Sequence, residues 1–213
     1  QTYKNIELII NDDNSQDDSV NLIEDWIKRN DAINVKFFKQ NINQGLCKSA
    51  NRILQNANGK YINIIASDDY FLPDFIKKRV EFLENTDDSV GLCYSWTKII
   101  YEDGRNPLLE KREKSPSGYL FDHITEGYSS LCKPLTILVK REVFQTVGYY
   151  DEELIYEDLD WFLRASKKYR FLFFDSYDTV YRERSGTLGT KIYTTEKGIL
   201  SQLKIIEKNI GYS

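Results

Sequence analysis

Residues 6–15 read Ile-Glu-Leu-Ile-Ile-Asn-Asp-Asp-Asn-Ser, an apolar, β-branched run that stops at a cluster of short polar side chains. A short apolar run of this kind predicts a buried strand, and Asn, Asp and Ser favour turns and helix starts. Apolar side chains then recur at three- and four-residue spacing, which predicts a helix with one buried stripe (Val20, Ile23, Trp26 and Ile27). The segment therefore predicts a strand, a polar loop and a helix in succession.

The same succession repeats through the first half of the chain. Strands are expected at residues 35–38 and 61–66, and helices at residues 47–57 and from Pro73 onward. Strands that alternate with helices over short connections favour an α/β fold, in which helices flank a mostly parallel central sheet.

The second half of the chain changes character. Residues 90–101 are expected to form one long strand, residues 102–105 a hairpin turn, and residues 105–118, which contain two prolines, a mobile loop. The remaining expected elements are helices at 140–147, 156–168 and 193–209, a strand at 171–174 and a basic loop at 181–186. Because no repeat or linker interrupts the chain, we expect a single domain over residues 1–213, with two regions, 1–102 and 103–213.

Composition excludes several classes of protein. Of the 213 residues, 41% are apolar and 29% charged, as in globular domains, and no apolar run approaches the roughly 18 residues of a transmembrane segment. The net charge of −4 argues against a nucleic-acid partner. Three cysteines without a CxxC pair favour a reducing, cytoplasmic location, and the single histidine, His123, excludes mechanisms that need two.

Two pairs of aspartates follow predicted strands, Asp12-Asp13 after the first and Asp68-Asp69 after the third. In open parallel sheets, ligands bind beyond the carboxyl ends of the strands. Carboxylates there suit a divalent cation that neutralises a diphosphate. The competing interpretation is that these residues only form turns and helix caps.

A third acidic cluster, Glu157-Asp158, begins a predicted helix that also carries Trp161. A carboxylate beside an aromatic ring suits a general base that takes the proton of a sugar hydroxyl. The competing interpretation is that these acids only complement the helix dipole. Basic residues at Lys48 and in the loop after Tyr181 are further candidates for contact with phosphate.

Taken in order, these segments resemble the family 2 glycosyltransferases, which have the Rossmann-like GT-A fold. The likeness is carried by residues 1–15, by Asn43-Gln44-Gly45 with Asn51 and residues 59–62, by Ala66-Ser67-Asp68-Asp69 at the DxD position, and by residues 133–141, 148–152 and 157–161. The resemblance implies a nucleotide-sugar-binding half over residues 1–102 and an acceptor-side half, with a small antiparallel region, over residues 103–213.

The resemblance also implies roles for individual residues. Asp158 would deprotonate the acceptor hydroxyl for an inverting attack, with Glu157 and Trp161 positioning that base and the acceptor sugar. The residues implied on the donor side are Asp13 and Asp12 at the nucleotide base, Asp68 and Asp69 at a divalent cation (Mg²⁺ or Mn²⁺), with Asp68 also at the diphosphate, and Lys48, Arg182 and Arg184 at the nucleotide-sugar. The implied substrates are a UDP-sugar donor and a glycan or glycoprotein acceptor.

Three departures from the family pattern change these expectations. Ala66 replaces the first Asp of the DxD motif, and Arg184 stands where many relatives carry a histidine, so we expect a weakened requirement for the cation. The family's first strand and helix have no counterpart before Gln1. We therefore expect a longer parent polypeptide, impaired donor binding and self-association into a homo-oligomer.

Two other functions remain open at the level of sequence. A nucleotidyltransferase also uses acidic strand ends and magnesium, but it would release pyrophosphate rather than UDP. A degenerate domain that only binds carbohydrate or mediates assembly is consistent with Ala66.

Overall fold

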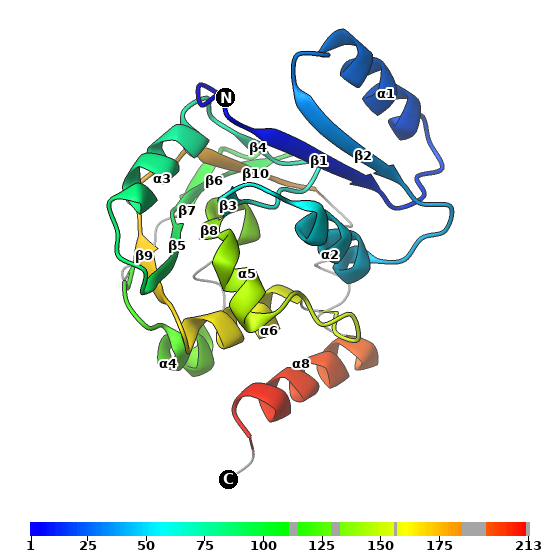
Figure 1. The fold of residues 1–213 in the computed structure, drawn as a ribbon. Coiled ribbons are helices and arrows are strands. Elements are labelled where there is room, and N and C mark those ends of the chain that lie inside the picture. The colour runs from blue at the N-terminus through cyan, green and yellow to red at the C-terminus, as the bar shows by residue number, and fades with distance from the viewer. Residues whose placement is uncertain (111–114, 129–132, 156, 185–194, 212–213) are drawn as a thin grey trace.

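The strands form three sheets, and each sheet contains one parallel pair (Figure 1). The computed structural model describes residues 1–110, 115–128, 133–155, 157–184 and 195–211. Within them three strand pairings are parallel and four antiparallel. The predicted α/β class is confirmed, but the strands are divided among mixed sheets rather than gathered in one mostly parallel sheet.

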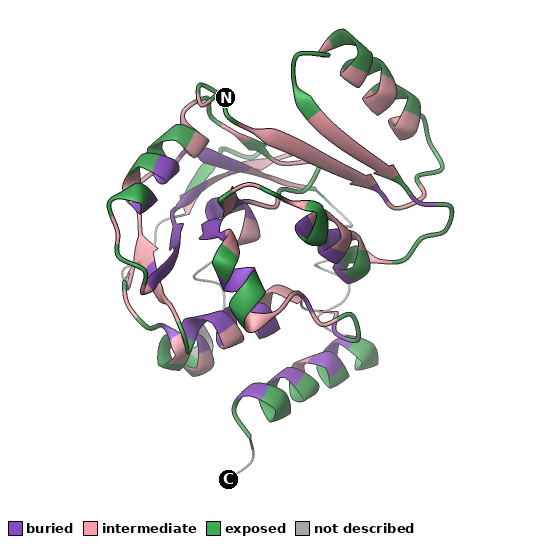
Figure 2. Cartoon of the chain, viewed as in Figure 1, coloured by how far each residue is buried: buried purple, intermediate pink, exposed green. Residues whose placement is uncertain are grey.

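The first sheet pairs β1 (Glu7–Asp12) with β2 (Asn34–Lys39) in parallel, from Glu7 opposite Asn34 to Asp12 opposite Lys39. The helix between them, α1 (Ser19–Arg29), contains no buried residue (Figure 2). Trp26 is 36% exposed, so the predicted buried stripe is only half-buried. The reason is that α1 lies over a two-stranded sheet, which is too narrow to cover it (Figure 1).

The second sheet has the order β3-β8-β5-β9 and carries the main hydrophobic core. Its strands are β3 (Tyr61–Ile62), β8 (Leu138–Lys140), β5 (Val90–Tyr94) and β9 (Arg170–Phe173). β8 runs antiparallel to both of its neighbours, which makes this sheet mixed. β3 is shorter than the predicted strand at 61–66, since the side chain of Asn63 donates to the carbonyl of Ile137 (2.6 Å) where the ladder ends.

The third sheet has the order β4-β10-β6-β7 and corrects three predictions. Its strands are β4 (Tyr70–Phe71), β10 (Thr179–Glu183), β6 (Thr97–Tyr101) and β7 (Leu108–Glu110). The expected strand at 90–101 is divided into β5 and β6, which belong to different sheets. The expected mobile loop at 105–118 contains β7, and the expected basic loop begins inside β10; the predicted hairpin turn joins β6 to β7.

A buried ion pair fixes the junction between these two sheets. Arg79, on α3 (Phe75–Glu84), lies 2.8 Å from the carboxylate of Asp178, and both side chains are almost completely buried. The guanidinium also donates to the hydroxyl of Ser95 (2.5 Å), which lies between β5 and β6. A buried charge needs such partners because desolvation is costly. The pair thus holds α3 against the start of β10.

The remaining helices and helical turns are α2 (Leu46–Asn56), α4 (Phe121–His123), a π-helical turn (Ile124–Tyr128), a 3₁₀ turn (Pro134–Thr136), α5 (Arg141–Val147), α6 (Glu157–Ser166) and α8 (Glu196–Asn209). Of these, α2 packs beside β1 and α5 against β8, and α8 lies on α6 at the C-terminal end (Figure 1). Arg164 of α6 donates to the carbonyls at the end of α5, including that of Tyr149 (2.7 Å). No helix in the described part of the chain is long and apolar enough to cross a membrane.

Candidate active site

Asp13 connects the end of β1 to the start of α2. Its two carboxylate oxygens accept the backbone N–H groups of Gln44 and Gly45, each at 2.8 Å. Gly45 has φ +87°, a backbone conformation that disfavours a side chain, and α2 begins at the next residue. The neighbouring Asp12 is buried and accepts the N–H of Ser15 (3.0 Å), so it stabilises the loop itself. The loop that the sequence predicts at a nucleotide is therefore built around Asp13.

Asp68 and Asp69 lie in a turn that is held by β10. The carboxylate of Asp69 accepts the backbone N–H of Arg182 (2.9 Å), and the guanidinium of Arg182 donates to the carbonyl of Asp68. Burial raises the pKa of the Asp69 carboxyl, while the N–H group and the positive charge of Arg182 oppose that rise. Arg182 thus shapes the acidic turn, in addition to its expected place at the nucleotide-sugar.

The donor set in this turn fits a cation that is only partly bound by protein. In the described residues no three His, Cys, Asp or Glu side chains are grouped so that they could hold a metal ion. Asp68 is half-buried, and Asp69 has one carboxylate oxygen on the Arg182 N–H. Mg²⁺ commonly uses one or two carboxylates and completes its shell with phosphate oxygens and water. The two aspartates fit this mode and do not form a cage of protein ligands.

The expected basic residues lie in different surroundings. Arg182 and Arg184 both line a cavity of about 140 Å³ beside the ends of β6 and β10. Lys48 is exposed on α2. Lys133, which the sequence did not assign to the donor side, contacts the ring of Tyr181 (5.1 Å to its centroid). Its positive charge partly opposes the rise that burial causes in the pKa of Asp69.

A larger cavity, of about 400 Å³, lies at the opposite end of β3 from the acidic turn. Its charged lining is balanced, with Lys60, Lys140 and Arg141 beside Glu84, Asp88 and Glu142. Lys60 is already paired with Glu84 (2.8 Å). Because none of the aspartates and glutamates of the three acidic clusters lines this cavity, we assign the cavity no part in the site.

Glu157 and Asp158 begin α6 and influence one another's protonation. Burial, reinforced by the negative charge of Asp158, raises the pKa of Glu157 to about 7. Burial also raises the pKa of Asp158. The backbone N–H of Leu159 donates to the Asp158 carboxylate (2.8 Å) and partly opposes this rise. Two adjacent half-buried carboxyls of this kind hold a proton near neutral pH, which suits a group that exchanges protons with a substrate.

Trp161 lies in the hydrophobic core. It is 1% exposed, stacks on Phe144 (4.5 Å between ring centroids) and donates its indole N–H to the carbonyl of Gly148 (3.1 Å). A direct contact with an acceptor sugar, expected from the sequence, is not supported by this geometry, because the ring has no accessible face. Its location instead fixes α6 against α5.

The first turns of α2 connect the donor loop to the carboxylates of α6. The thiol of Cys47 donates to the carbonyl of Leu154 (3.1 Å), three residues before Glu157. The charge of Glu157 contributes to the raised pKa of Cys47, about 11, although burial is the larger cause. The sequence assigns Cys47 no role, since a lone cysteine carries no signal of what it contacts.

Comparison with known proteins agrees with this arrangement. The sequence model described as glycosyl transferase family 2 matches residues 1–148, more than half of the chain. The chain belongs to glycosyl transferase family 2. An uncharacterised glycosyltransferase of Methanocaldococcus jannaschii is 31% identical to this family 2 chain over 186 residues, which cover 85% of the chain and 62% of the relative. The chain thus spans less than two thirds of that relative.

A second relative covers almost the whole of the family 2 chain. The UDP-Glc:α-D-GlcNAc-diphosphoundecaprenol β-1,3-glucosyltransferase WfaP of Escherichia coli is 28% identical over 215 residues, 99% of the chain and 77% of the relative.

Two solved structures show the GT-A fold of the family 2 chain. A mannosyltransferase of Pyrobaculum calidifontis in complex with GDP-Man and Mn²⁺ has a TM-score of 0.68 at 14% identity, covering 97% of the chain and 55% of that protein. Staphylococcus aureus TarS 1-349 in complex with UDP has a TM-score of 0.64 at 18% identity, covering 96% of the chain and 61% of that protein.

Proposed function

We propose that this chain transfers a sugar from a nucleotide-sugar, with UDP as the nucleotide, to a hydroxyl of a glycan or glycoprotein acceptor, with inversion at the anomeric carbon. One observation carries the proposal: a single helix, α2, contacts both the donor loop and the segment that leads to the acidic pair. The helix begins directly after Gly45, whose N–H group donates to Asp13, and Cys47, two residues after Gly45, donates to the carbonyl of Leu154. Donor and acceptor chemistry would then meet at the start of this helix.

Asp158 is the proposed general base. Its carboxylate takes the proton of the acceptor hydroxyl as the oxygen attacks the anomeric carbon, and the bond to the nucleoside diphosphate breaks on the opposite side. A general base contributes about 10²- to 10⁴-fold to a rate. Burial raises the pKa of both carboxyls, that of Glu157 to about 7, so the pair can take up a proton near neutral pH, and we assign the contact with the acceptor hydroxyl to Asp158.

The leaving diphosphate needs positive charge. Arg182 and Arg184 line one cavity, which Glu102 and Glu183 also line, and Arg182 contacts the acidic turn directly. We assign the two arginines to the diphosphate. Asp68, with Asp69, would hold a divalent cation, which when bound neutralises the charge of the diphosphate. The Mn²⁺ in the Pyrobaculum structure supports a cation in this fold.

The donor nucleotide is inferred from two sources. The Escherichia coli relative is named for UDP-Glc, and the Staphylococcus aureus structure contains UDP, whereas the Pyrobaculum structure contains GDP-Man. The acceptor in the name of the Escherichia coli protein is a diphosphoundecaprenol-linked GlcNAc, so glycans on lipid carriers belong among the acceptors to test.

The test is a mass-spectrometric screen of UDP- and GDP-sugars with glycan acceptors, followed by analysis of the released phosphate species. Free UDP together with a glycosylated acceptor is the expected result. A parallel reaction that supplies UTP and a sugar 1-phosphate would instead identify a nucleotidyltransferase by its release of pyrophosphate. Glycan binding with no consumption of any donor would identify a non-catalytic domain.

A further inference from the structure

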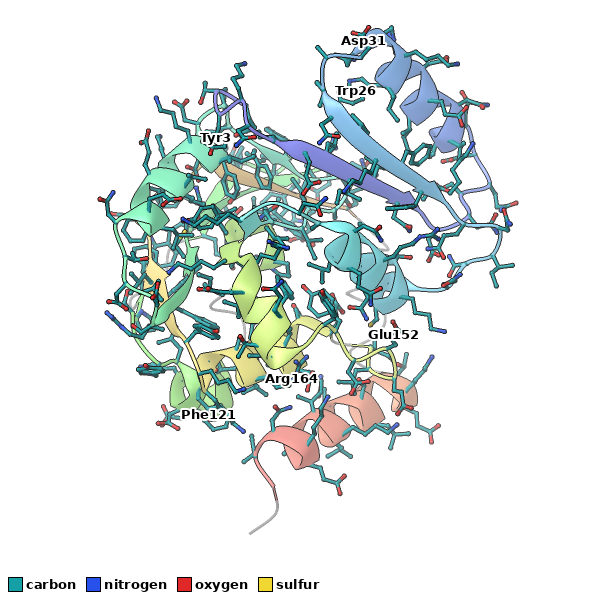
Figure 3. The ribbon with its side chains drawn as sticks, viewed as in Figure 1. Tyr3, Trp26, Asp31, Phe121, Glu152 and Arg164 are labelled. Carbon is teal, nitrogen blue, oxygen red and sulfur yellow. The ribbon has the colours of Figure 1, made fainter. Side chains whose placement is uncertain are left out.

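Asn51 uses all of its side-chain hydrogen-bonding groups on one short segment. It lies in α2, is 3% exposed, and accepts the backbone N–H of Tyr150 at its carbonyl oxygen (2.9 Å). Its amide nitrogen donates to the carbonyl of Tyr150 (2.9 Å) and to the carboxylate of Glu152 (3.0 Å). Figure 3 shows Glu152 on the loop that lies between α2 and α8. The Asn51 side chain thus bonds both the N–H and the C=O of Tyr150, as a neighbouring strand would, and holds the backbone at this residue.

The segment held by Asn51 leads directly into α6. One helical turn before Asn51, the thiol of Cys47 donates to the carbonyl of Leu154 (3.1 Å), so two side chains on one face of α2 hold the same loop. From the opposite side, α8 contributes the hydroxyl of Ser201, which accepts the N–H of Ile155 (2.9 Å). The start of α6, and with it the acidic pair, is therefore located by contacts that α2 and α8 make to this loop.

We infer that Asn51 is a positioning residue for the general base. It fixes the loop that sets the location of Glu157 and Asp158, and it does so from the helix whose first turn also holds the donor loop through Gly45 and Asp13. Loss of this contact displaces the base from the donor while leaving the donor loop bound. The inference rests on the proposed function, since it assigns Asn51 to the same site.

The test compares N51D with N56D. N51D keeps the size of the side chain but replaces its N–H donors with an acceptor that faces the Tyr150 carbonyl and the Glu152 carboxylate. Asn56 lies in the same helix, but its exposed amide donates to the carbonyl of Arg52 (2.8 Å) within that helix and not to the loop, which makes N56D a matched control.

The first readout is amide hydrogen exchange over residues 149–159, which needs no substrate. Losing buried hydrogen bonds of this strength should speed local exchange by about 10-fold or more in N51D and by less than about 2-fold in N56D. Equal exchange in the two variants would overturn the inference. If the N51D variant does not fold, E152A replaces it in the test. E152A removes one exposed acceptor of Asn51 and should speed amide exchange by a smaller factor, in the same segment only.

The second readout separates chemistry from donor binding. N51D should lower kcat by about 10-fold or more, with the dissociation constant of UDP within about 2-fold of the unmodified chain. The double variant N51D/E152Q restores a donor opposite the new carboxylate and should recover part of the rate. A loss of UDP binding equal to the loss of kcat, or no recovery in the double variant, would contradict a positioning role. If the unmodified chain turns over no donor, the proposed function fails, while the exchange readout still decides whether Asn51 fixes the loop.

Discussion

Replacing Glu157 with glutamine should remove most of the pH dependence of stability between pH 4.5 and 7. In the folded chain, burial and the neighbouring charge of Asp158 raise the pKa of Glu157 from 4.5 to about 7. Between these two values the folded chain holds a proton at Glu157 that the unfolded chain has lost, so stability falls as the pH rises. The raised pKa corresponds to about 3 kcal/mol, which is present below pH 4.5 and lost by about pH 7.

Glutamine mimics the protonated carboxyl and does not ionise. E157Q should therefore match the unmodified chain near pH 4.5 and exceed its free energy of unfolding by up to about 3 kcal/mol at pH 8. Some pH dependence will remain in the same direction, because burial also raises the pKa of Asp158. In a transfer assay, the acidic limb of the pH–rate profile should move to lower pH in E157Q, since the base no longer shares a proton with its neighbour.

The assay is urea unfolding at several values between pH 4.5 and 8, followed by the fluorescence of the three tryptophans. Glu153 is exposed on the preceding loop, so E153Q provides a control that changes the same charge without the burial. Stability curves that run parallel in E157Q and the unmodified chain would refute the assignment of a raised pKa to Glu157. So would an equal effect in E153Q.

Four further substitutions test individual parts of the site and core. D158N should reduce sugar transfer by about 10²- to 10⁴-fold without changing the calorimetric affinity for UDP; near-normal turnover would show that the base lies elsewhere. D68N should raise the Mn²⁺ concentration needed for UDP binding by about 10-fold or more, whereas binding and transfer that are unaffected by a chelator in the unmodified chain would show that residues such as Arg184 neutralise the diphosphate alone. In urea unfolding, W161A should cost about 3–5 kcal/mol and W26A well under half of that, because Trp161 is buried and Trp26 is 36% exposed; similar losses would contradict the core packing described.

Sequence patterns predicted those elements whose signal is local. The strand that ends at Asp12, the helix that starts after Gly45 and the helix that ends at Gly148 are all confirmed, since each combines a periodic run with a recognisable end. The division of residues 90–101 could not be predicted in this way. Ser95 interrupts the strand because it is buried and bound to Arg79, a residue 16 positions away in the chain.

The same distinction, between local sequence signals and contacts over long distances in the chain, applies to the candidate site. Carboxylates at strand ends and at a helix start are visible in the sequence because residue type and position suffice. The contacts that locate them are not, since Asn51 reaches Tyr150 over 99 residues and Arg182 reaches Asp69 over 113. Trp161 illustrates the opposite case. An aromatic residue near a predicted base suggests a contact with the acceptor sugar, but the position of Trp161 on its helix directs the side chain into the hydrophobic core.

The stereochemistry of the product tests the central claim most directly. A donor with an α-linked sugar should be incubated with the chain and a glycan acceptor, and the anomeric proton of the new glycoside followed by NMR from the first turnovers. A single displacement assisted by Asp158 predicts a β-linked product and free UDP in equal amounts. An α-linked product, or consumption of the donor without a glycosylated acceptor, would contradict the account.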